Sequence, residues 1–492
     1  MFPARADLAR LAPEIVLTVF GILAMVLAPF ADASRKDGRR SGGWVIGISV
    51  FGALLAILST LYPARDPGDA FSGLLRVDDF SLFVHWIVLG VALLVLLGSA
   101  SYLRREDLPP GEFCALVLFA AVGMCVMTSG KELVTVFIGL EISSISSYVL
   151  VSYRRDSPLA DEAAMKYFLL GSFATAFFLY GVALVYGATG TTHLDLITSD
   201  AVNAASRFLP LGLGLILVGL AFKVAAAPFQ IWAPDVYQGA PTPVTAFLST
   251  GPKAATFAVL LRIVGTIEPA SGVWVWALWG MAVLSMFGGN LAALVQSNVK
   301  RMLAYSSIAH AGYILVAVAA AAAAATHESV ADCIAAAIFY LVAYALMKLG
   351  AFLMVAQLSG PGEGRQDLDD FAGLGSRQPV AAAGLSIFLL SLLGLPVTAG
   401  FLAKFYVFRV ALSSGLFWLV VLLAINSVIA AYYYLRVIVV MFMREPKQEW
   451  PFVRISAAAS LALFIAAAGT VYLGLFPGRV VDLAMRAAAS LR

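Results

Sequence analysis

The chain has 492 residues, of which 61% are hydrophobic and only 12% are charged, and its mean hydropathy is +0.91. A soluble domain carries about twice that share of charged residues, so the composition excludes a soluble enzyme and indicates a polytopic membrane protein. The net charge of +3 is too small to imply an anionic partner, and the chain has no basic run suited to nucleic acid.

Apolar segments of roughly twenty residues, the length that a bilayer core requires, predict about fourteen transmembrane helices. In chain order the predicted spans are 8–30, 44–62, 79–102, 112–129, 132–153, 162–188, 208–227, 242–266, 272–297, 301–323, 331–358, 378–413 (long and interrupted), 417–443 and 454–476. The first run is long enough to span and a basic loop follows it, which indicates a first helix and not a cleavable signal. No stretch outside these spans is long enough for a soluble domain, so we expect an all-α protein that works inside the membrane.

The distribution of cations predicts the orientation, because cytoplasmic loops are enriched in lysine and arginine. The loops after odd-numbered spans hold most of them: Arg35, Lys36, Arg39, Arg40, Arg104, Arg105, Arg154, Arg155, Lys300, Arg301, Arg365, Arg377, Arg444, Lys447 and Arg454. The loops after even-numbered spans hold little beyond Arg65, Arg76, Lys131 and Arg207. This predicts that both termini lie on the outer side of the membrane, although cations near the two ends argue against it (Arg5, Arg10, Arg479, Arg486 and Arg492).

Two predicted helices, the seventh and the twelfth, are interrupted in a similar way. Helix 7 breaks around Pro228, with Lys223 just before the break, and helix 12 breaks within "GLPVTAGFLAKF", where Pro396 and Gly400 interrupt and Lys404 follows. Unpaired backbone at this depth is tolerated only inside protein or beside water. Interrupted helices at matching places in two halves of a chain indicate a transport site near the midplane.

The breaks suggest a division of the chain into repeats. Residues 1–111 would form helices 1–3, residues 112–266 a first five-helix repeat (helices 4–8), residues 267–443 a second repeat (helices 9–13), and residues 444–492 helix 14 and a tail. Since five is odd, the second repeat is inverted relative to the first.

Seven ionisable residues lie within the predicted spans: Glu141, Lys166, Lys223, Lys253, His310, Lys348 and Lys404. Each costs roughly 2.5–3.5 kcal/mol at a helix centre, so seven facing lipid would cost on the order of 20 kcal/mol. We therefore expect them to face one another or internal water. Near a span end a long side chain can instead reach the headgroups, which is the expectation for Lys131, Glu132 and Arg262 and an alternative for Lys166 and Lys253. His310, on a serine-rich face, fits a structural histidine equally well.

The excess of lysines over carboxylates within the predicted spans indicates proton transfer. Five lysines share the interior with one clear carboxylate, Glu141, so they cannot all be charged. Some of them should gain and lose protons near neutral pH as coupled sites. A row of such groups, linked by serines and water, can pass protons.

Other chemistries find little support in the sequence. Carboxylates and histidines are too few and scattered to predict a metal site. Cys114, Cys125 and Cys333 are isolated in apolar segments and fit small core residues. There is no serine–histidine–acid set, and "SGPGEG" at 359–364 lacks the strand-to-helix context of a nucleotide loop.

Several motifs resemble the antiporter-like membrane subunits of respiratory complex I, the proton-pumping NADH–quinone oxidoreductase. The most specific is "PFQIWAPDVYQGAPTPVTAFL" (228–248), whose "PDVYQGAPTPV" is similar to subunit N and differs from sister subunits L and M. "GLEISSISSYVL", "AMKYFLLGS", "KRMLAYSSIAHAGY" and "GLPVTAGFLAKFYVF" agree with that group in order and spacing. The resemblance covers nearly the whole chain. It implies a proton-translocating translocase subunit whose partners are the other membrane-arm subunits and the lipid bilayer.

The resemblance also implies roles for individual residues. Glu141 and Lys223 match the carboxylate and lysine that pair as a switch, and Lys166 matches a lysine that tunes this pair. Lys253 matches the residue that receives the proton, and Lys404 the residue that passes it outward. NADH, FMN, iron–sulfur clusters and quinone would belong to other subunits, with no cofactor in this chain.

The sequence departs from the pattern at two positions. Gln230 stands where the family often has histidine, and a glutamine hydrogen-bonds but does not accept a proton, which puts a relay through that position in doubt. Lys348 stands where a small polar residue is expected. It is either an added relay group or a charge that shifts the pKa values of its neighbours.

Three rival functions stay open at this point. The first is an Mrp-type cation/proton antiporter subunit, against which "PDVYQGAPTPV" argues. The second is a sister subunit of the same complex; subunit L would need a long lateral helix, whereas only sixteen residues follow Phe476. The third is a membrane scaffold that does not pump.

Overall fold

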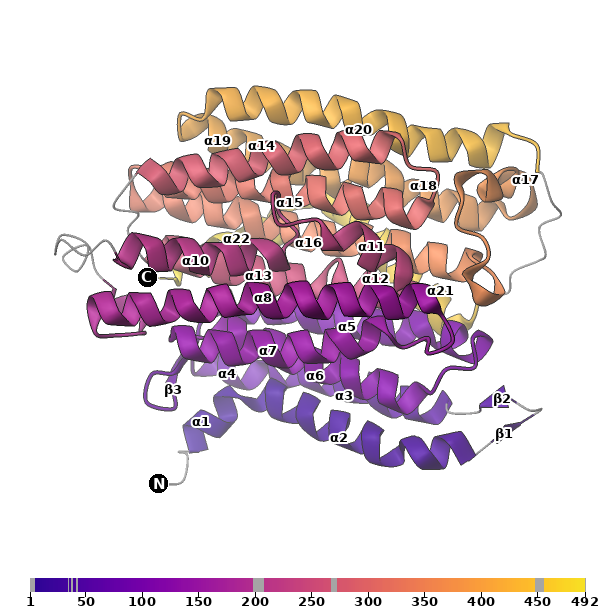
Figure 1. The fold of residues 1–492 in the computed structure, drawn as a ribbon, viewed down its shortest axis with the longest axis horizontal. Coiled ribbons are helices and arrows are strands. Elements are labelled where there is room, and N and C mark those ends of the chain that lie inside the picture. The colour runs from indigo at the N-terminus through magenta and orange to yellow at the C-terminus, as the bar shows by residue number, and fades with distance from the viewer. Residues whose placement is uncertain are drawn as a thin grey trace.

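The computed structural model describes residues 5–33, 35–36, 39–40, 43–197, 208–266, 272–446 and 455–491. Long helices run side by side through the molecule, and the two ends of the chain lie at the same edge of the bundle (Figure 1). The connections at the opposite edge include most of the cation-rich loops. The side chains of Arg35, Lys36, Arg39 and Arg40, and the residues Arg207, Lys447, Arg454 and Arg492, lie outside the described part.

The first half of the chain is helical apart from two short hairpins. Its helices are α1 (Arg5–Arg10), α2 (Ala12–Ala33), α3 (Gly43–Ser59), α4 (Leu61–Arg65), α5 (Asp79–Arg105), α6 (Pro110–Ser129), α7 (Leu133–Val151), α8 (Pro158–Thr189), η1 (Leu194–Leu196), α10 (Phe208–Lys223), α11 (Trp232–Gly239), α12 (Thr242–Leu248) and α13 (Gly251–Thr266). The antiparallel hairpins join β1 (Arg35–Lys36) to β2 (Arg39–Arg40), and β3 (Gly68–Ala70) to β4 (Leu75–Val77).

The second half is entirely helical in the described residues. Its elements are α14 (Gly272–Leu294), α15 (Val299–Ala323), α16 (His327–Leu358), η2 (Pro361–Glu363), η3 (Leu368–Phe371), α17 (Leu374–Arg377), α18 (Pro379–Leu393), α19 (Ala399–Ser413), α20 (Phe417–Met443), α21 (Ala457–Leu475) and α22 (Gly478–Ala489). The helix α22, which follows the last predicted span, was not expected from the hydropathy because one of its faces is polar.

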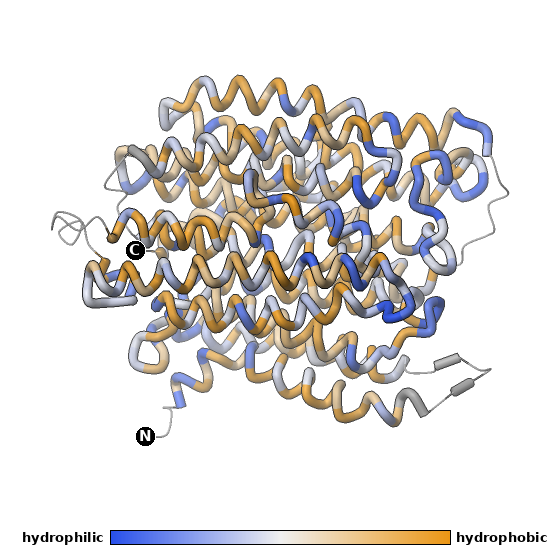
Figure 2. The backbone as a smooth tube through the Cα atoms, viewed as in Figure 1, coloured by the Kyte–Doolittle hydropathy of each residue, from blue (hydrophilic) through white to orange (hydrophobic). Residues whose placement is uncertain are grey.

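The described residues contain twelve helical segments long and apolar enough to cross a membrane. Two shorter apolar helices, α10 and α18, coincide with the helices predicted to be interrupted. Apolar residues run along the length of the helices and hydrophilic ones gather where the connections lie, with isolated hydrophilic positions inside (Figure 2). The all-helical membrane fold is thus confirmed, whereas the count of fourteen and the inverted repeats stay predictions.

The centre of the bundle is formed by helices that are apolar around their whole circumference, which is expected where every face is buried. Every residue from Gly251 to Val264 of α13 is buried, as are nearly all of those in α15 and most of those in α16. By contrast only 33% of the residues in the apolar spans of α2, α8, α20 and α21 are buried, and many large apolar residues there are exposed. These outer helices therefore face lipid or other subunits.

Both predicted breaks are present. The helix α10 ends at Lys223 and the chain resumes helical form at Trp232, while α18 ends at Leu393 and α19 begins at Ala399. Each break holds a residue other than glycine with positive φ, Ala225 (φ 55°) in the first and Val397 (φ 77°) in the second. Such a conformation costs an L-residue about 1–3 kcal/mol and persists only where the surroundings impose it.

Candidate functional site

Lys223 is the last residue of α10, so its ammonium group lies where the helix dipole favours a cation. The side chain is 5% exposed. Its Nζ donates hydrogen bonds to Ser144 Oγ (2.8 Å) on α7 and Tyr167 Oη (3.2 Å) on α8. It also lies over the rings of Tyr148 (5.4 Å) and Tyr167 (5.1 Å), whose π faces attract a cation.

Glu141 lies on the same face of α7 as Ser144, one turn earlier, because the two are three residues apart. The residue is half-buried, and its Oε1 is buried without a hydrogen-bond partner among the described residues. Within the described part of the chain, the carboxylate does not come within the 4.0 Å of an ion pair with Lys223. The two residues that were predicted to pair are therefore neighbours, but Lys223 is held by hydroxyl groups.

Lys253, near the start of α13, is 1% exposed. Its Nζ donates to Ser307 Oγ (2.7 Å) and to the Ser307 carbonyl (2.8 Å) on α15. Ser307 Oγ in turn contacts Tyr344 Oη at 2.7 Å. Although Lys253 lies near the end of a span, its side chain therefore points into the centre of the bundle and does not extend to the headgroups.

Lys348, on α16, is fully buried and donates to Ser306 Oγ (2.8 Å) and the Leu303 carbonyl (2.6 Å). Ser306 Oγ and Tyr434 Oη form a short hydrogen bond, and Tyr434 Oη lies 3.3 Å from His310 Nε2. These contacts join a lysine, two hydroxyl groups and an imidazole into one network.

His310 continues this network on its other side, since its Nδ1 contacts Tyr340 Oη at 2.7 Å. The ring is 1% exposed and packs against the ring of Tyr313 at 5.4 Å. A histidine whose two nitrogens both contact hydroxyl groups is satisfied structurally, and the same arrangement is suited to passing a proton.

Lys404, on α19, reaches back across the second break. Its Nζ donates to the Leu393 carbonyl (2.8 Å) at the C-terminal end of α18, where the helix dipole again favours a cation. Gly394 has φ +94°, and a Cβ there would lie 3.2 Å from Lys404 Cδ. The ammonium also lies 4.9 Å from the centre of the Tyr313 ring, whose hydroxyl accepts from Asn290 Nδ2 (3.0 Å).

The structure thus brings Lys253, Lys348, His310 and Lys404 into one buried region around α15. Lys223 lies on the far side of an aromatic group: Tyr167 stacks on Trp232 (4.6 Å between centroids), and Trp232 meets Tyr237 edge-on (5.8 Å). Stacked rings do not carry protons, so transfer between the Lys223 region and Lys253 requires water or motion of these side chains.

Lys166 lies apart from this row. Its side chain is 41% exposed, and its Nζ pairs with Glu162 (2.6 Å) and Asp235 (2.7 Å). Asp235 also pairs with Arg301 (2.8 Å), so α8, α11 and α15 are linked at this point. The next residue, Tyr167, binds Lys223, which connects Lys166 to the predicted switch through the backbone of α8.

Gln230 lies in the connection between α10 and α11 and is partly exposed. Its Oε1 is buried without a hydrogen-bond partner among the described residues. Whether position 230 takes part in proton transfer stays open.

Two buried ion pairs were missed by the sequence-based prediction. Arg262 was expected to extend toward the headgroups, but it is 5% exposed and forms two hydrogen bonds with Asp78 (2.8 and 3.0 Å). Burial alone would raise the pKa of Asp78, but the Arg262 guanidinium lowers it below its ordinary value. The partners are 184 residues apart in sequence, so no local pattern joined them; in the structure Asp78 is also the N-cap of α5.

Lys300, counted above among the loop cations, is the second residue of α15 and is fully buried. It pairs with Glu363 Oε2 (2.7 Å) and donates to the Ala240 carbonyl (2.8 Å). Glu363 Oε1 accepts from the Thr242 N–H and hydroxyl, both at 2.7 Å. The pair therefore holds the junction between α11 and α12, directly after the broken helix.

Comparison with known proteins shows to which family the chain belongs. Residues 130–469 match the sequence pattern of the family described as NADH:quinone oxidoreductase/Mrp antiporter, transmembrane. The chain belongs to this family. The matched region contains all seven predicted site residues.

Relatives within the family agree over nearly the full chain. NADH-quinone oxidoreductase subunit N 1 of Solibacter usitatus is 50% identical, over 99% of this chain and 98% of the relative. Subunit N 2 of Koribacter versatilis is 49% identical, over 99% and 97%. The resemblance to subunit N is therefore confirmed.

Solved structures agree with the fold. A chain of respiratory complex I from Thermus thermophilus matches with a TM-score of 0.79 and 37% identity, over 96% of this chain and 98% of that one. A chain of the Mrp complex from Dietzia matches with a TM-score of 0.84 over 98% and 97%, but at 21% identity it supports the fold alone.

Proposed function

We propose that this chain is the proton-translocating subunit N of a bacterial NADH–quinone oxidoreductase. Its role is to move protons through a buried Glu/Lys relay, driven by electron transfer from NADH to quinone in other subunits. The observation that carries the proposal is the set of four buried lysines (Lys223, Lys253, Lys348 and Lys404), each held by hydroxyl or carbonyl oxygens inside the bundle. None of the four has a carboxylate within ion-pair distance among the described residues, so each is free to lose its proton without leaving a buried anion unpaired.

The first step is the switch at Lys223. With the ammonium on Ser144, a rotation of the flexible lysine stem over one helical turn would bring it to Glu141. Pairing with the carboxylate stabilises the charged lysine, and separation removes that stabilisation in a region of low dielectric. Lys223 in the separated position therefore gives its proton to water on the inner side of the aromatic group.

The second step runs along α15. Lys253 takes up the proton at Ser307, and the adjacent Ser306 is the acceptor for Lys348. The Tyr434 hydroxyl and His310 extend the path toward Tyr340. Transfer from there to Lys404 requires water, since Lys404 meets only the ring face of Tyr313. In this scheme Lys348 is a member of the relay, and Lys404 releases the proton to the outer side.

The chain's setting in the membrane is part of the same proposal. Both termini lie on one edge of the bundle and are assigned to the periplasm, with the cation-rich edge in the cytoplasm. The paired breaks, each with one residue other than glycine at positive φ, support the assignment of residues 112–266 and 267–443 to two inverted repeats.

The partners are other membrane-arm subunits, against which the apolar surfaces of the outer helices would pack. Both solved structures above are multi-subunit assemblies. NADH, FMN, iron–sulfur clusters and quinone are assigned to the other subunits of the complex.

The test is proton pumping by the assembled complex carrying Lys223→Ala or Glu141→Ala. Both variants should lower NADH-driven proton uptake into membrane vesicles together with quinone-linked turnover, while assembly is preserved. Lys131→Ala, at the membrane edge, is the matched control and should pump normally. Unchanged stoichiometry and rate in the two test variants would show that the chain is a scaffold.

A second candidate is an Mrp-type antiporter subunit, because the family that matches residues 130–469 is described as including Mrp antiporters as well as NADH:quinone oxidoreductase. This function predicts exchange of Na⁺ or K⁺ for H⁺ in vesicles under an imposed pH gradient without NADH. Proton pumping that requires NADH and is indifferent to these cations would exclude it.

A further inference from the structure

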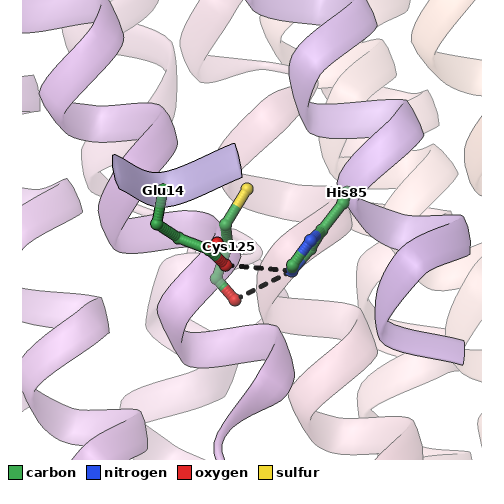
Figure 3. A group of neighbouring side chains, drawn as sticks. All are labelled: Glu14, His85 and Cys125. Atoms are coloured by element: carbon green, nitrogen blue, oxygen red, sulfur yellow. Dashed lines mark hydrogen bonds and ion pairs between the residues drawn. The ribbon is translucent and has the colours of Figure 1, made fainter. Parts of the chain in front are cut away.

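Three side chains that could bind a metal ion meet among three of the N-terminal helices. Glu14 comes from α2, His85 from α5 and Cys125 from α6, and all three are buried (Figure 3). Their candidate ligand atoms all lie within 4.8 Å of one another. All three residues precede residue 130, where the region matched by the family begins. None of the three is a member of the proposed relay.

The polar atoms of this cluster are incompletely satisfied. Both carboxylate oxygens of Glu14 and the Nδ1 of His85 are buried without a hydrogen-bond partner among the described residues. His85 Nε2 contacts the Cys125 carbonyl (3.1 Å) and Ser129 Oγ (3.1 Å), and it lies 3.7 Å from Glu14 Oε1. A carboxylate that is 4% exposed with both oxygens unpaired is expensive to bury unless a cation neutralises it.

We propose that Glu14, His85 and Cys125 form a binding site for a Zn²⁺ ion. A carboxylate oxygen, an imidazole nitrogen and a thiolate sulfur are the three ligand types that Zn²⁺ takes in proteins. The charge also balances: a divalent cation neutralises one carboxylate and one thiolate, and a neutral imidazole adds nothing. A site of zero net charge is what a membrane-embedded position requires.

Bonds from zinc to its ligands are about 2.0–2.3 Å long. The ligand atoms of Glu14, His85 and Cys125 would therefore have to move slightly closer together to bind one ion. Such a site would fasten α2, which is exposed over most of its length, to the buried helices α5 and α6. Three protein ligands leave one position of a tetrahedral zinc open, and binding requires no change of redox state. The sequence did not predict the site, because its members lie 71 and 40 residues apart on three different helices.

The experiment uses the purified full-length chain in detergent, stripped with a chelator and reloaded with Zn²⁺. Elemental analysis after gel filtration should find one zinc per chain in the wild type. Glu14→Gln and Cys125→Ser should each lower the affinity for Zn²⁺ by more than about tenfold, measured by competition with a chelating dye. Glu14→Gln replaces the carboxylate by a neutral group of the same shape, so this variant is expected to fold.

Two matched controls address binding elsewhere. Cys114→Ser changes the other buried cysteine of α6, and His327→Ala removes a histidine at the start of α16; both should bind zinc like the wild type. Loading with Co²⁺ should give a thiolate-to-cobalt charge-transfer band that is lost in Cys125→Ser and kept in Cys114→Ser. A wild-type chain without zinc, or zinc and cobalt signals unaffected by Glu14→Gln and Cys125→Ser, would overturn the proposal and leave Glu14 as a buried protonated carboxyl.

Discussion

The Nζ of Lys223 donates a 2.8 Å hydrogen bond to Ser144 Oγ, one helical turn from Glu141 on the same face of α7. The lysine of the broken helix therefore rests on a neutral hydroxyl beside the carboxylate that is its proposed partner. This geometry defines one of the two positions that a proton switch needs, and Ser144 is the residue that stabilises it.

Ser144→Ala should slow proton pumping. A hydrogen bond from a charged group is worth about 1.5–3 kcal/mol, so its loss disfavours the separated position of Lys223 and lowers the pumping rate by about tenfold. The measurement is the initial rate of NADH-driven proton uptake in vesicles. Ser146→Ala is the matched control, since that hydroxyl bonds only to the Ile142 carbonyl of its own helix. Equal rates in both variants would rule out Ser144 as the resting partner.

Lys348→Met tests whether the unexpected lysine of α16 carries protons. Methionine has a similar length and no charge, so the buried space stays filled while the proton carrier is removed. We expect pumping to fall by at least about tenfold, with thermal stability of the complex unchanged or higher, because a buried cation is replaced by an apolar group. Normal pumping together with altered stability would assign Lys348 a structural role.

Tyr434→Phe removes the hydroxyl that links Ser306 to His310. The ring stays in place, so we expect a loss of about 1 kcal/mol in stability from the hydrogen bonds, but a drop in pumping of about tenfold or more. Tyr432→Phe, at an exposed position two residues earlier, is the control and should behave like the wild type. If the two variants pump alike, the path does not pass through Tyr434.

The pair of Lys300 and Glu363 should make stability depend on acid pH. Burial would raise the pKa of Glu363, but the charge of Lys300 and hydrogen bonds from Lys300, Tyr102 and Thr242 lower it to about 2 from its ordinary value of 4.5. Because the folded-state pKa is depressed, the carboxylate contributes its stabilisation above about pH 4.5. This contribution, about 3 kcal/mol, is lost as the pH falls toward 2.

Glu363→Gln removes this contribution. The variant should unfold at a lower temperature than the wild type at pH 7, and the difference should shrink between pH 4.5 and 2. Glu328→Gln, an exposed carboxylate in the first turn of α16, is the control and should show no such convergence. A difference that is constant over this pH range would mean that Glu363 is not held as a charged partner of Lys300.

The buried pair of Asp78 and Arg262 should be coupled. Asp78→Ala leaves a buried guanidinium without its partner and should cost about 3–5 kcal/mol. The double variant with Arg262→Ala should be more stable than the sum of the two single effects by at least about 1 kcal/mol, measured by thermal unfolding. Additive losses would show that the two charges do not stabilise each other.

Local patterns were sufficient for the membrane class and for the two broken helices. Apolar runs of span length predict helices wherever they occur, because a bilayer requires every backbone group to be satisfied within its own segment. Prolines mark the breaks for an equally local reason, and Pro228 and Pro396 both lie within them. Gly400, which was expected to interrupt the second helix, is instead the second residue of α19. The high cost of burying Lys223, Lys348 and Lys404 indicated from composition and depth that they are interior groups, whereas extension to the headgroups stayed an alternative for Lys253.

What each buried charge contacts was decided by the packing of distant helices. Lys223 lies on Ser144, 79 residues away, and Arg262 on Asp78, 184 residues away. Lys300 was assigned to a loop because its partner Glu363 is 63 residues further on. Glu14, His85 and Cys125 looked scattered for the same reason. Hydropathy indicates how costly a side chain is to bury. The residue that it contacts depends on which side chain of a neighbouring helix lies at the same depth, and only the tertiary structure determines this.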